Sequence, residues 1–317
     1  METRNKMEFD RLKTYWEILN AIKSLHGRAT YKEIAKEMGH TGRGRSPSTI
    51  QRHFTNMKER KITRDPILIQ KPYRESQTKV YFCRKTERKE VTKTYEQLCN
   101  DERINYVLYL AGDIDYFVTS RKDLDLKHYD IEIVEKNKLF EPIFTFPFKR
   151  SWEISSDVLY EKSLTLKFEK EKLDRKVCND LRWDKIDWDI YESMKFNVRK
   201  PFSIISKEMK ISQKTVKSHF YKIILPACLL AYYFFPEGYD FYKQTFVQIY
   251  TRFEKGLINA FKNLAMTTYI YPLEDRIVLN CFHEDENFFM GMIKGLEENG
   301  IIEKYIYAIP IKPSAEF

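Results

Sequence analysis

Polar and basic side chains recur at helical spacing in two stretches of the chain, at residues 46–58 and 212–223. On one face of a helix, guanidinium and carboxamide groups can pair with guanine and adenine in the major groove of DNA, while lysines contact phosphates. The pattern therefore predicts two helices that read DNA. The side chains expected to contact DNA from them are Ser48, Thr49, Gln51, Arg52, Thr55, Gln213, Lys214, Thr215, Lys217, Ser218 and Tyr221.

Apolar side chains recur at i, i+4 and i+7 on the opposite face of each expected helix, which predicts a buried stripe. Ser46 and Ser212 precede the two helices, and a serine hydroxyl there can accept from a free backbone N–H group of the first turn. Both helices are therefore expected to begin at a serine N-cap. The stripes are Ile50, Phe54 and Met57 in the first helix and Val216, Phe220 and Ile223 in the second.

The two helices belong to near copies of one unit. Tyr31–Met38 resembles Phe202–Met209, which lies 171 positions later (202 − 31), whereas the serine caps lie 166 positions apart (212 − 46). The first copy therefore carries five extra residues, Thr41–Arg45. Arg43 and Arg45 are candidates for contacts with phosphates or a minor groove, and a mobile loop with no role is the alternative. Helix, turn and helix in each copy predict a duplicated helix-turn-helix unit, with protein contact as the alternative role.

Strand-like segments follow the first copy. Pro66–Gln70 and Lys79–Cys83 are rich in β-branched and aromatic residues and flank a polar segment, which predicts a hairpin and hence a winged helix. Lys71 and Arg74 at the expected tip are further candidates for phosphate contacts, with a solvated hairpin tip as the alternative.

The remaining segments predict two α+β modules. In the second half, the order from Thr245 is β-α-β-β-α-β, which is typical of a ferredoxin-like sheet. In the first half the second helix is short or missing, so that module is expected to be degenerate. The predicted fold class is α+β, with winged helix-turn-helix domains at 1–78 and 181–236, a degenerate module at 79–148, a linker at 149–180 and a ferredoxin-like module at 237–317.

Composition narrows the class of protein. A chain of 317 residues with net charge +9 is long enough for two to three domains and favours polyanionic partners. Cys83, Cys99, Cys178, Cys228 and Cys281 have no metal-ligand spacing, so no metal site, no cofactor and free thiols in a reducing cytosol are expected. The longest apolar run, Ala227–Phe235, is too short to cross a bilayer, which predicts a soluble cytoplasmic protein.

Several segments, in this order, resemble the Lrp/AsnC family of transcription regulators. In that family a helix-turn-helix is followed by a β-α-β-β-α-β effector module. The sequence departs from the pattern at Pro272–Arg276, where the family has a Gly-x-x-Asp turn. The resemblance places a possible small-molecule effector site at Gly112, Asp113 and Asp115, with a ligand-free turn as the alternative. The matching segments are Gly112–Tyr116, Arg121–Asp125, Trp183–Asp187, Ile211–Lys217 and Asn299–Glu303.

The leading interpretation is a sequence-specific DNA-binding transcription regulator without catalytic activity, whose partners are double-stranded DNA and a possible effector. We also expect a homodimer, because the first module is polar and so a poor internal match for the second. Two alternatives remain open. Some proteins that resemble the family in both modules are sirohaem decarboxylases, for which His128 and His283 are the available histidines. A winged-helix scaffold for protein contacts is the other.

Overall fold

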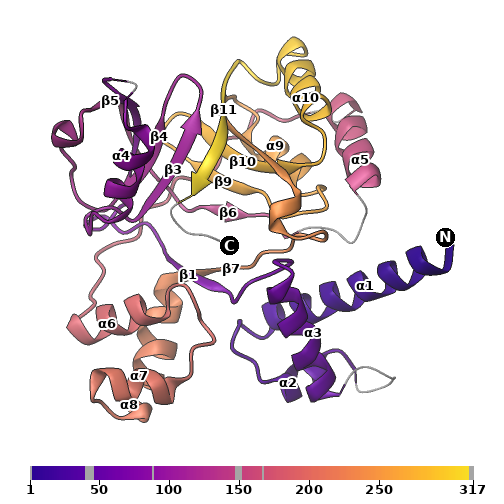
Figure 1. Cartoon of the computed structure of the whole chain (residues 1–317), viewed down its shortest axis with the longest axis vertical. Helices are drawn as coiled ribbons and strands as arrows, with labels where there is room; N and C mark the ends of the chain where they lie inside the picture. Colours follow the sequence, from indigo (N-terminus) through magenta and orange to yellow (C-terminus); the bar gives the residue numbers. More distant parts are fainter. Residues whose placement is uncertain (1, 40–45, 88, 147–151, 166–167, 314–317) are drawn as a thin grey trace. The chain divides into compact units, whose positions relative to one another are not determined.

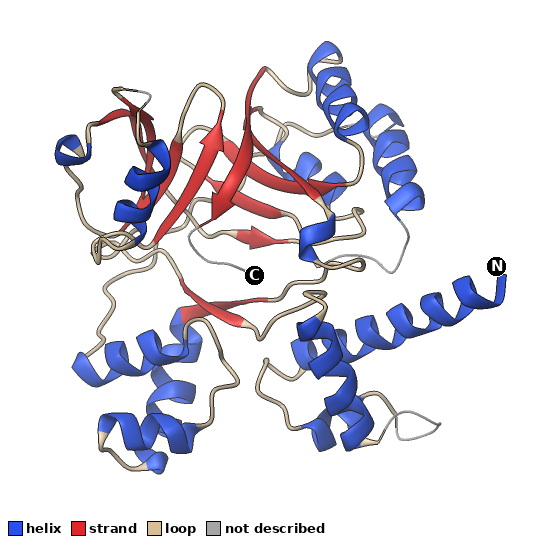
Figure 2. Cartoon of the chain, in the orientation of Figure 1, coloured by secondary structure: helices blue, strands red, loops and turns tan. Residues whose placement is uncertain are grey.

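The computed structural model describes residues 2–39, 46–87, 89–146, 152–165 and 168–313. The described residues form helices and antiparallel strands, so the predicted α+β class is confirmed at this level (Figures 1 and 2). The chain divides into two compact units. Unit 1 comprises Met1–Lys71, Phe146–Arg150 and Arg182–Phe241, and unit 2 comprises Pro72–Thr145, Ser151–Leu181 and Tyr242–Phe317.

Unit 1 contains two similar helix clusters and one small sheet. Thr30, Ser46 and Ser212 are N-caps, and the two serine hydroxyls accept from backbone N–H groups at 3.2 and 3.0 Å, as expected from the sequence. The elements are α1 (Glu2–Ser24), α2 (Tyr31–Glu37), α3 (Pro47–Glu59), β1 (Ile67–Gln70), α6 (Lys185–Met194), α7 (Phe202–Met209), α8 (Gln213–His219), a π-helix (Phe220–Ile224), a 3₁₀ turn (Leu225–Ala227), β7 (Cys228–Ala231) and a 3₁₀ turn (Tyr239–Phe241).

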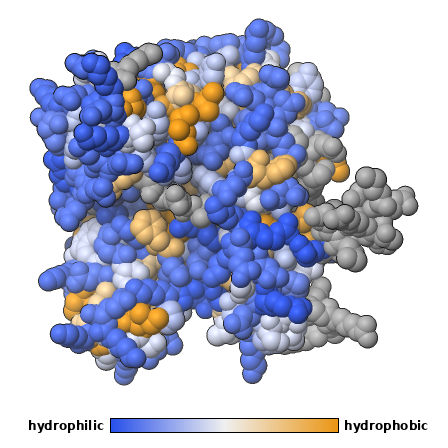
Figure 3. Space-filling view, viewed as in Figure 1, coloured by the Kyte–Doolittle hydropathy of each residue, from blue (hydrophilic) through white to orange (hydrophobic). Residues whose placement is uncertain are grey.

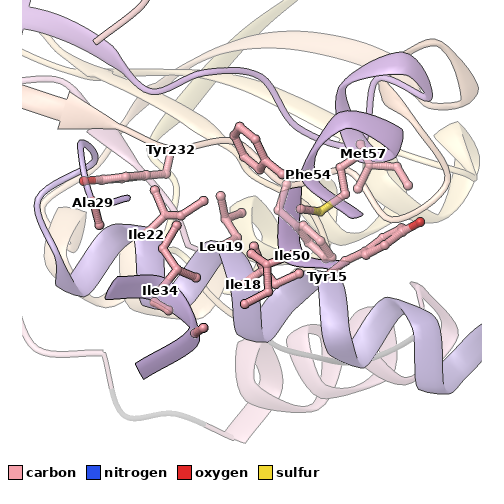
Figure 4. Close-up of a cluster of buried hydrophobic side chains, with 14 residues drawn as sticks. Tyr15, Ile18, Leu19, Ile22, Ala29, Ile34, Ile50, Phe54, Met57 and Tyr232 are labelled. Carbon is pink, nitrogen blue, oxygen red and sulfur yellow. The ribbon is translucent and has the colours of Figure 1, made fainter. Parts of the chain in front are cut away.

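The apolar stripe of α3 is fully buried, as Figure 4 shows for Ile50, Phe54 and Met57. In the second copy Val216 and Phe220 are buried, but Ile224 takes the buried place expected for Ile223. The backbone after α8 is a π-helix, Phe220–Ile224. A π-helix has more residues per turn than an α-helix, so the buried face moves one position along the chain.

The strand after each helix cluster packs into the core of the other cluster. β1 pairs antiparallel with β7, from Ile67 opposite Ala231 to Gln70 opposite Cys228. Leu68 of β1 lies in the core of α6–α8, whereas Tyr232 and Phe234 after β7 lie in the core of α1–α3. The predicted hairpin of β1 with β2 is therefore wrong, because β1 pairs across the duplication instead.

Two equivalent arginines join the clusters reciprocally. Arg28 lies over the Phe202 ring at 3.8 Å and donates to the Lys200 carbonyl at 3.0 Å. Arg199, which is 171 positions later (199 − 28), lies over the Tyr31 ring at 5.2 Å and donates to the Gly27 carbonyl at 3.1 Å. The copies thus contact each other through the same surface, as the subunits of a two-fold dimer do.

Unit 2 contains one nine-stranded sheet in the order β5-β2-β4-β3-β11-β8-β10-β9-β6. The first half contributes β5-β2-β4-β3 and the second contributes β11-β8-β10-β9. The elements are β2 (Lys79–Lys85), α4 (Val91–Cys99), β3 (Tyr106–Ala111), β4 (Tyr116–Ser120), a 3₁₀ turn (Lys127–Tyr129), β5 (Ile131–Lys138), β6 (Ile143–Phe144), α5 (Trp152–Thr165), β8 (Lys243–Tyr250), α9 (Glu254–Phe261), β9 (Tyr269–Pro272), β10 (Ile277–His283), α10 (Glu286–Glu298) and β11 (Lys304–Pro313).

The two halves of unit 2 share a hydrophobic core. The Phe117 ring lies 5.1 Å from Phe246 and 5.9 Å from Tyr271, which belong to the other half. The expectation that the first half is too polar to pair within the chain is wrong, because its alternate strand residues are apolar. The homodimer itself stays a prediction. The shared core consists of Val80, Phe82, Leu108, Leu110, Ile114, Phe117, Phe246, Leu273, Val278 and Ala308.

A buried arginine also connects the halves of unit 2. Arg276 is 1% exposed; it pairs with Glu135 at 2.7 Å and with Asp275 at 2.9 Å. Its guanidinium lies 5.0 Å from the ring centres of both Phe82 and Tyr250. The Pro272–Arg276 turn, where the sequence departs from the Lrp/AsnC pattern, thus packs against β5.

Apolar side chains also lie on the outer surface of unit 2. Tyr307, Ile309 and Ile311 of β11 are 50%, 42% and 54% exposed. In Figure 3 an orange patch marks this surface, where β3 meets β11. Their alternation along the strand places them on one face of the sheet.

Candidate functional site

A buried histidine ends the central strand of the second half. His283 closes β10 and is paired in register with Lys243, the first residue of β8. Its side chain is fully buried, and the ring stacks on Phe289 of α10 with a centroid distance of 5.1 Å and an interplanar angle of 8°. Its Nε2 lies 2.7 Å from the Thr245 hydroxyl oxygen. Strand, neighbouring strand and helix therefore fix the ring from three sides.

Burial determines the charge of this histidine. Burial, which is the larger cause, and the nearby Lys243 together lower the pKa of His283 to about 4, while Asp285 acts in the opposite direction. The imidazole is therefore neutral at pH 7. Its Nδ1 atom is buried and has no hydrogen-bond partner among the residues that the structure describes. A neutral ring has one donor nitrogen and one acceptor nitrogen, so Nδ1 can serve a bound group in whichever role Thr245 leaves to it.

Other buried polar atoms in the second half also lack partners. They are Ser155 Oγ on α5, Thr268 Oγ1 before β9 and Asn280 Oδ1 on β10, and each of these residues is at most 2% exposed. Buried polar groups in folded proteins are almost always hydrogen-bonded, so such a set points to waters or a ligand. His283 and Thr245 define the candidate site; Asn280 lies on the opposite face of the sheet, because it is three residues from His283 along β10.

At the position in the first half that corresponds to His283 and Thr245, the polar side chains form hydrogen bonds within the protein. Lys79, the first residue of β2, is paired with Ser120, the last residue of β4, as Lys243 is with His283. The Ser120 hydroxyl donates to the Arg103 carbonyl at 2.6 Å. The Tyr81 hydroxyl, two residues into β2 as Thr245 is into β8, donates to the Lys122 carbonyl at 3.2 Å. These two hydroxyls of the first half are therefore satisfied internally.

His128, the other histidine considered from the sequence, lies in the first half and is exposed. Its ring contacts Tyr129 at 3.9 Å in the 3₁₀ turn that stands where a second helix was expected. It contributes no side chain to the candidate site in the second half. Of the two histidines, only His283 is held in a buried polar environment.

The helix residues expected to contact DNA lie on α3, on α8 and, for Tyr221, in the π-helix after α8, and they are mostly exposed. The hydroxyls of Thr49 and Thr215 instead lie 2.8 Å from the capping serine hydroxyls, so they take part in the caps. Tyr221 packs edge-on against Phe202 and Phe220. Arg43 and Arg45 lie outside the described residues. These DNA contacts stay a prediction.

The two basic residues of the expected wing lie in different surroundings. The Lys71 ammonium donates to the Pro226 carbonyl at 2.9 Å. Arg74 is exposed, and its backbone N–H donates to the Cys178 carbonyl at 3.2 Å. Because β1 and β2 form no hairpin, Lys71 and Arg74 do not share a hairpin tip.

The proposed effector turn makes contacts within the protein. Gly112 has a φ of +154°, and a Cβ there would lie 3.2 Å from Ala308 Cβ on β11. The Asp113 carbonyl accepts from the Arg84 guanidinium at 2.8 and 3.0 Å, and the Asp115 carboxylate accepts from the Lys85 N–H at 2.7 Å. These contacts give the turn a structural role, and the effector site stays a prediction.

One group of potential metal ligands occurs among the described residues. Ligand atoms of Asp184, Asp187 and His219 lie within 4.8 Å of one another. Asp187 accepts from the Asp184 N–H at 3.1 Å and contacts His219 Nδ1 at 2.7 Å, so hydrogen bonds already use both of its carboxylate oxygens. The group is explained as the N-terminal cap of α6 tied to α8.

No protein-family model matches the chain, and no curated protein matches its sequence. Among solved structures, it is similar to a crystal structure of the sirohaem decarboxylase NirDL, with a TM-score of 0.55 and 10% identity over 98% of this chain and 92% of that chain. NirDL in co-complex with an iron-uroporphyrin III analogue matches with a TM-score of 0.53 and 8% identity over 94% and 92% of the two chains. At these identities the similarity shows the fold alone.

The comparisons correct the functional interpretation. The expectation of a protein without catalytic activity is wrong, because the solved structures that share this fold are enzymes. They give no support to DNA-binding regulation, while the sirohaem decarboxylase alternative agrees with them. The Lrp/AsnC resemblance is supported only as a coarse likeness of fold. None of the described helices has both the length and the apolar character needed to cross a bilayer.

Proposed function

We propose that this chain is a decarboxylase acting on an iron tetrapyrrole with carboxylate side chains, of the sirohaem type. One observation carries the proposal: the likeness to NirDL covers 98% of this chain and 92% of that one, so it includes both units. A shared module alone would leave much of one chain unmatched. Function does not follow from fold by itself, so the site must support it too.

The finer organisation belongs to the same proposal. We infer two helix-turn-helix halves in unit 1 and two ferredoxin-like halves in unit 2. In each half of unit 2 the first and third strands lie in the middle of the four: β2 and β4 in the first half, β8 and β10 in the second. In the second half a helix follows each of these two strands, α9 after β8 and α10 after β10. The first half has the 3₁₀ turn Lys127–Tyr129 in place of its second helix.

The substrate site is proposed at His283 in the second half. This half has buried polar atoms without partners, whereas the matching groups of the first half are satisfied. Lys243 is exposed beside His283 and supplies a positive charge for a substrate carboxylate. The proposal therefore assigns one site to each chain.

Loss of CO₂ breaks a carbon–carbon bond, leaves its electron pair on the substrate carbon and requires one proton at that carbon. His283 is neutral at pH 7, so it acts here as a hydrogen-bonding group. If the Thr245 hydroxyl donates to Nε2, the ring carries its proton on Nδ1, and Nδ1–H can donate to the substrate. Thr245 is then a positioning residue that fixes the tautomer.

An acidic hollow in the first half is a poor place for this substrate. It has a volume of about 640 Å³ and is lined by Glu87, Asp125, Asp130 and Glu132, and Lys127 is the one basic side chain among the described residues that line it. Like charges repel, so a polycarboxylate would be disfavoured there. This leaves the second half as the proposed site.

The assignment is tested with the variants His283→Gln and Thr245→Val and the surface control His128→Gln. Loss of a positioned hydrogen-bond donor is expected to lower the rate of CO₂ release about a hundredfold in His283→Gln. Thr245→Val should show a smaller loss, and His128→Gln should keep the wild-type rate. Equal rates in all four proteins would contradict the placement of the site.

A further inference from the structure

The helix clusters of unit 1 differ at one buried contact. In the second copy, His219 Nδ1 lies 2.7 Å from a carboxylate oxygen of Asp187, whose side chain is 3% exposed. The imidazole on α8 is therefore satisfied by a carboxylate from α6. In the second copy, a partly buried histidine at this position is thus paired with an anionic oxygen that accepts or shares its hydrogen bond.

In the first copy the same place has a histidine but no carboxylate. His53 on α3 corresponds to His219, because the two lie 166 positions apart (219 − 53), as the serine caps do. Tyr15 on α1 corresponds to Asp187, 172 positions apart (187 − 15), which is also the spacing of the buried Ile18 and Ile190. The Tyr15 and His53 rings meet edge-on at 5.6 Å and 66°.

Two polar atoms are left without partners by this difference. The Tyr15 hydroxyl and His53 Nδ1 are both buried and have no hydrogen-bond partner in the described part of the chain, and Tyr15 is 0% exposed. Figure 4 shows the Tyr15 hydroxyl directed away from Ile18 and Leu19. Leaving a buried donor unsatisfied costs about 1–3 kcal/mol, which favours a group that would pair with both atoms.

Positive charge surrounds these atoms. Arg11 lies over the Tyr15 ring at 5.8 Å, and Arg52 precedes His53 on α3. Both arginines are exposed, and neither has an ion pair among the described residues. Burial lowers the pKa of His53, and Arg52 and Arg11 lower it further. The missing partner should therefore be an anion that accepts hydrogen bonds.

We propose that Arg11, Tyr15, Arg52 and His53 bind an oxyanion of the phosphate type, with one oxygen in the place that the Asp187 carboxylate has in the second copy. Several oxygens on one centre can accept from the phenol, the imidazole and the guanidinium groups together. The oxyanion can be free phosphate or a phosphate group of a polynucleotide, which share this chemistry. The site is independent of the proposed decarboxylase activity.

The test is a titration of the full chain with inorganic phosphate, followed by the ¹⁵N signals of its histidine side chains. Chloride is varied inversely so that ionic strength stays constant. The His53 signals should shift and saturate while the His219 signals stay fixed, because Asp187 already occupies that position. Tyr15→Phe removes only the hydroxyl, and Arg52→Gln replaces the charged guanidinium by a shorter neutral amide; each is expected to weaken phosphate binding about tenfold.

Lys214→Gln on α8 is the matched control and should keep wild-type phosphate affinity. A second titration with a short DNA duplex distinguishes the sources: a His53 shift at much lower phosphate-group concentration assigns the site to a polynucleotide, and a shift with inorganic phosphate alone assigns it to the free ion. The proposal is overturned if neither probe shifts His53, if His219 shifts equally, or if folded Tyr15→Phe and Arg52→Gln both bind as the wild type does.

Discussion

The buried His283 should make the stability of unit 2 depend on pH. Its pKa in the folded chain is about 4, below the ordinary value of 6.5, so the unfolded chain takes up this proton first as the pH falls. The contribution of His283 to stability is complete above about pH 6.5 and is lost progressively down to about pH 4. For these two pKa values, linkage gives a loss of about 2 kcal/mol between about pH 7 and pH 5.

Native-state hydrogen exchange of the β10 amides measures this effect, because slow core amides report the global opening of a unit. The wild-type opening free energy should fall by about 2 kcal/mol more between those pH values than that of His283→Gln, which cannot titrate there. His128→Gln removes an exposed histidine and should keep the wild-type slope. If His283→Gln and wild type show the same pH dependence, the imidazole is not held neutral by burial.

Four further variants test individual contacts by urea denaturation. Arg276→Met should lower the free energy of unfolding of unit 2 by about 2 kcal/mol, less than for most buried ion pairs, because its carboxylate partners stay partly exposed; no loss would refute the bridging role. Gly112→Ala should cost about 1–2 kcal/mol, because its φ is strained for alanine and Ala308 is close; an unchanged midpoint would show that the turn adapts. Arg199→Ala should destabilise unit 1 by about 1–2 kcal/mol, read from tryptophan fluorescence, and a similar loss in Arg28→Ala is required if the two contacts are equivalent.

Local features of the fold were predictable from the sequence. Ser46 and Ser212 cap their helices, and Ile50, Phe54 and Met57 are buried, because capping and helical spacing depend on nearby residues only. The order β-α-β-β-α-β from β8 to β11 also follows from local patterns. The shift from Ile223 to Ile224 was not predictable, since it depends on a local change to a π-helix.

Pairing between distant segments was not predictable in the same way. The sequence predicts that β1 pairs with β2, the next strand along the chain. In the structure β1 pairs with β7 instead, and most of the residues between these two strands belong to unit 2. β3 and β11 join the two halves of the large sheet although nearly two hundred residues separate them. Strand patterns define which face is apolar, but they do not identify the neighbouring strand.

The candidate site was only partly visible in the sequence. His283 could be named as an available histidine, but its burial depends on α10, and its hydrogen bond depends on Thr245 of another strand. The sequence alone did not indicate that Tyr15 and His53 form a contact. Their importance follows only from comparison with the equivalent pair of Asp187 and His219 in the second copy. Alignment of the first helices of the two copies is the signal that would have found them.

The most direct test of the proposed activity is anaerobic incubation of the purified full chain with sirohaem, followed by mass spectrometry of the tetrapyrrole. We expect an absorption change on binding and a product that has lost one CO₂ for each side-chain carboxylate removed, with His283→Gln binding sirohaem but releasing CO₂ about a hundredfold more slowly. Unchanged sirohaem after incubation with folded protein, together with sequence-selective retardation of duplex DNA, would contradict the decarboxylase account and restore the regulator.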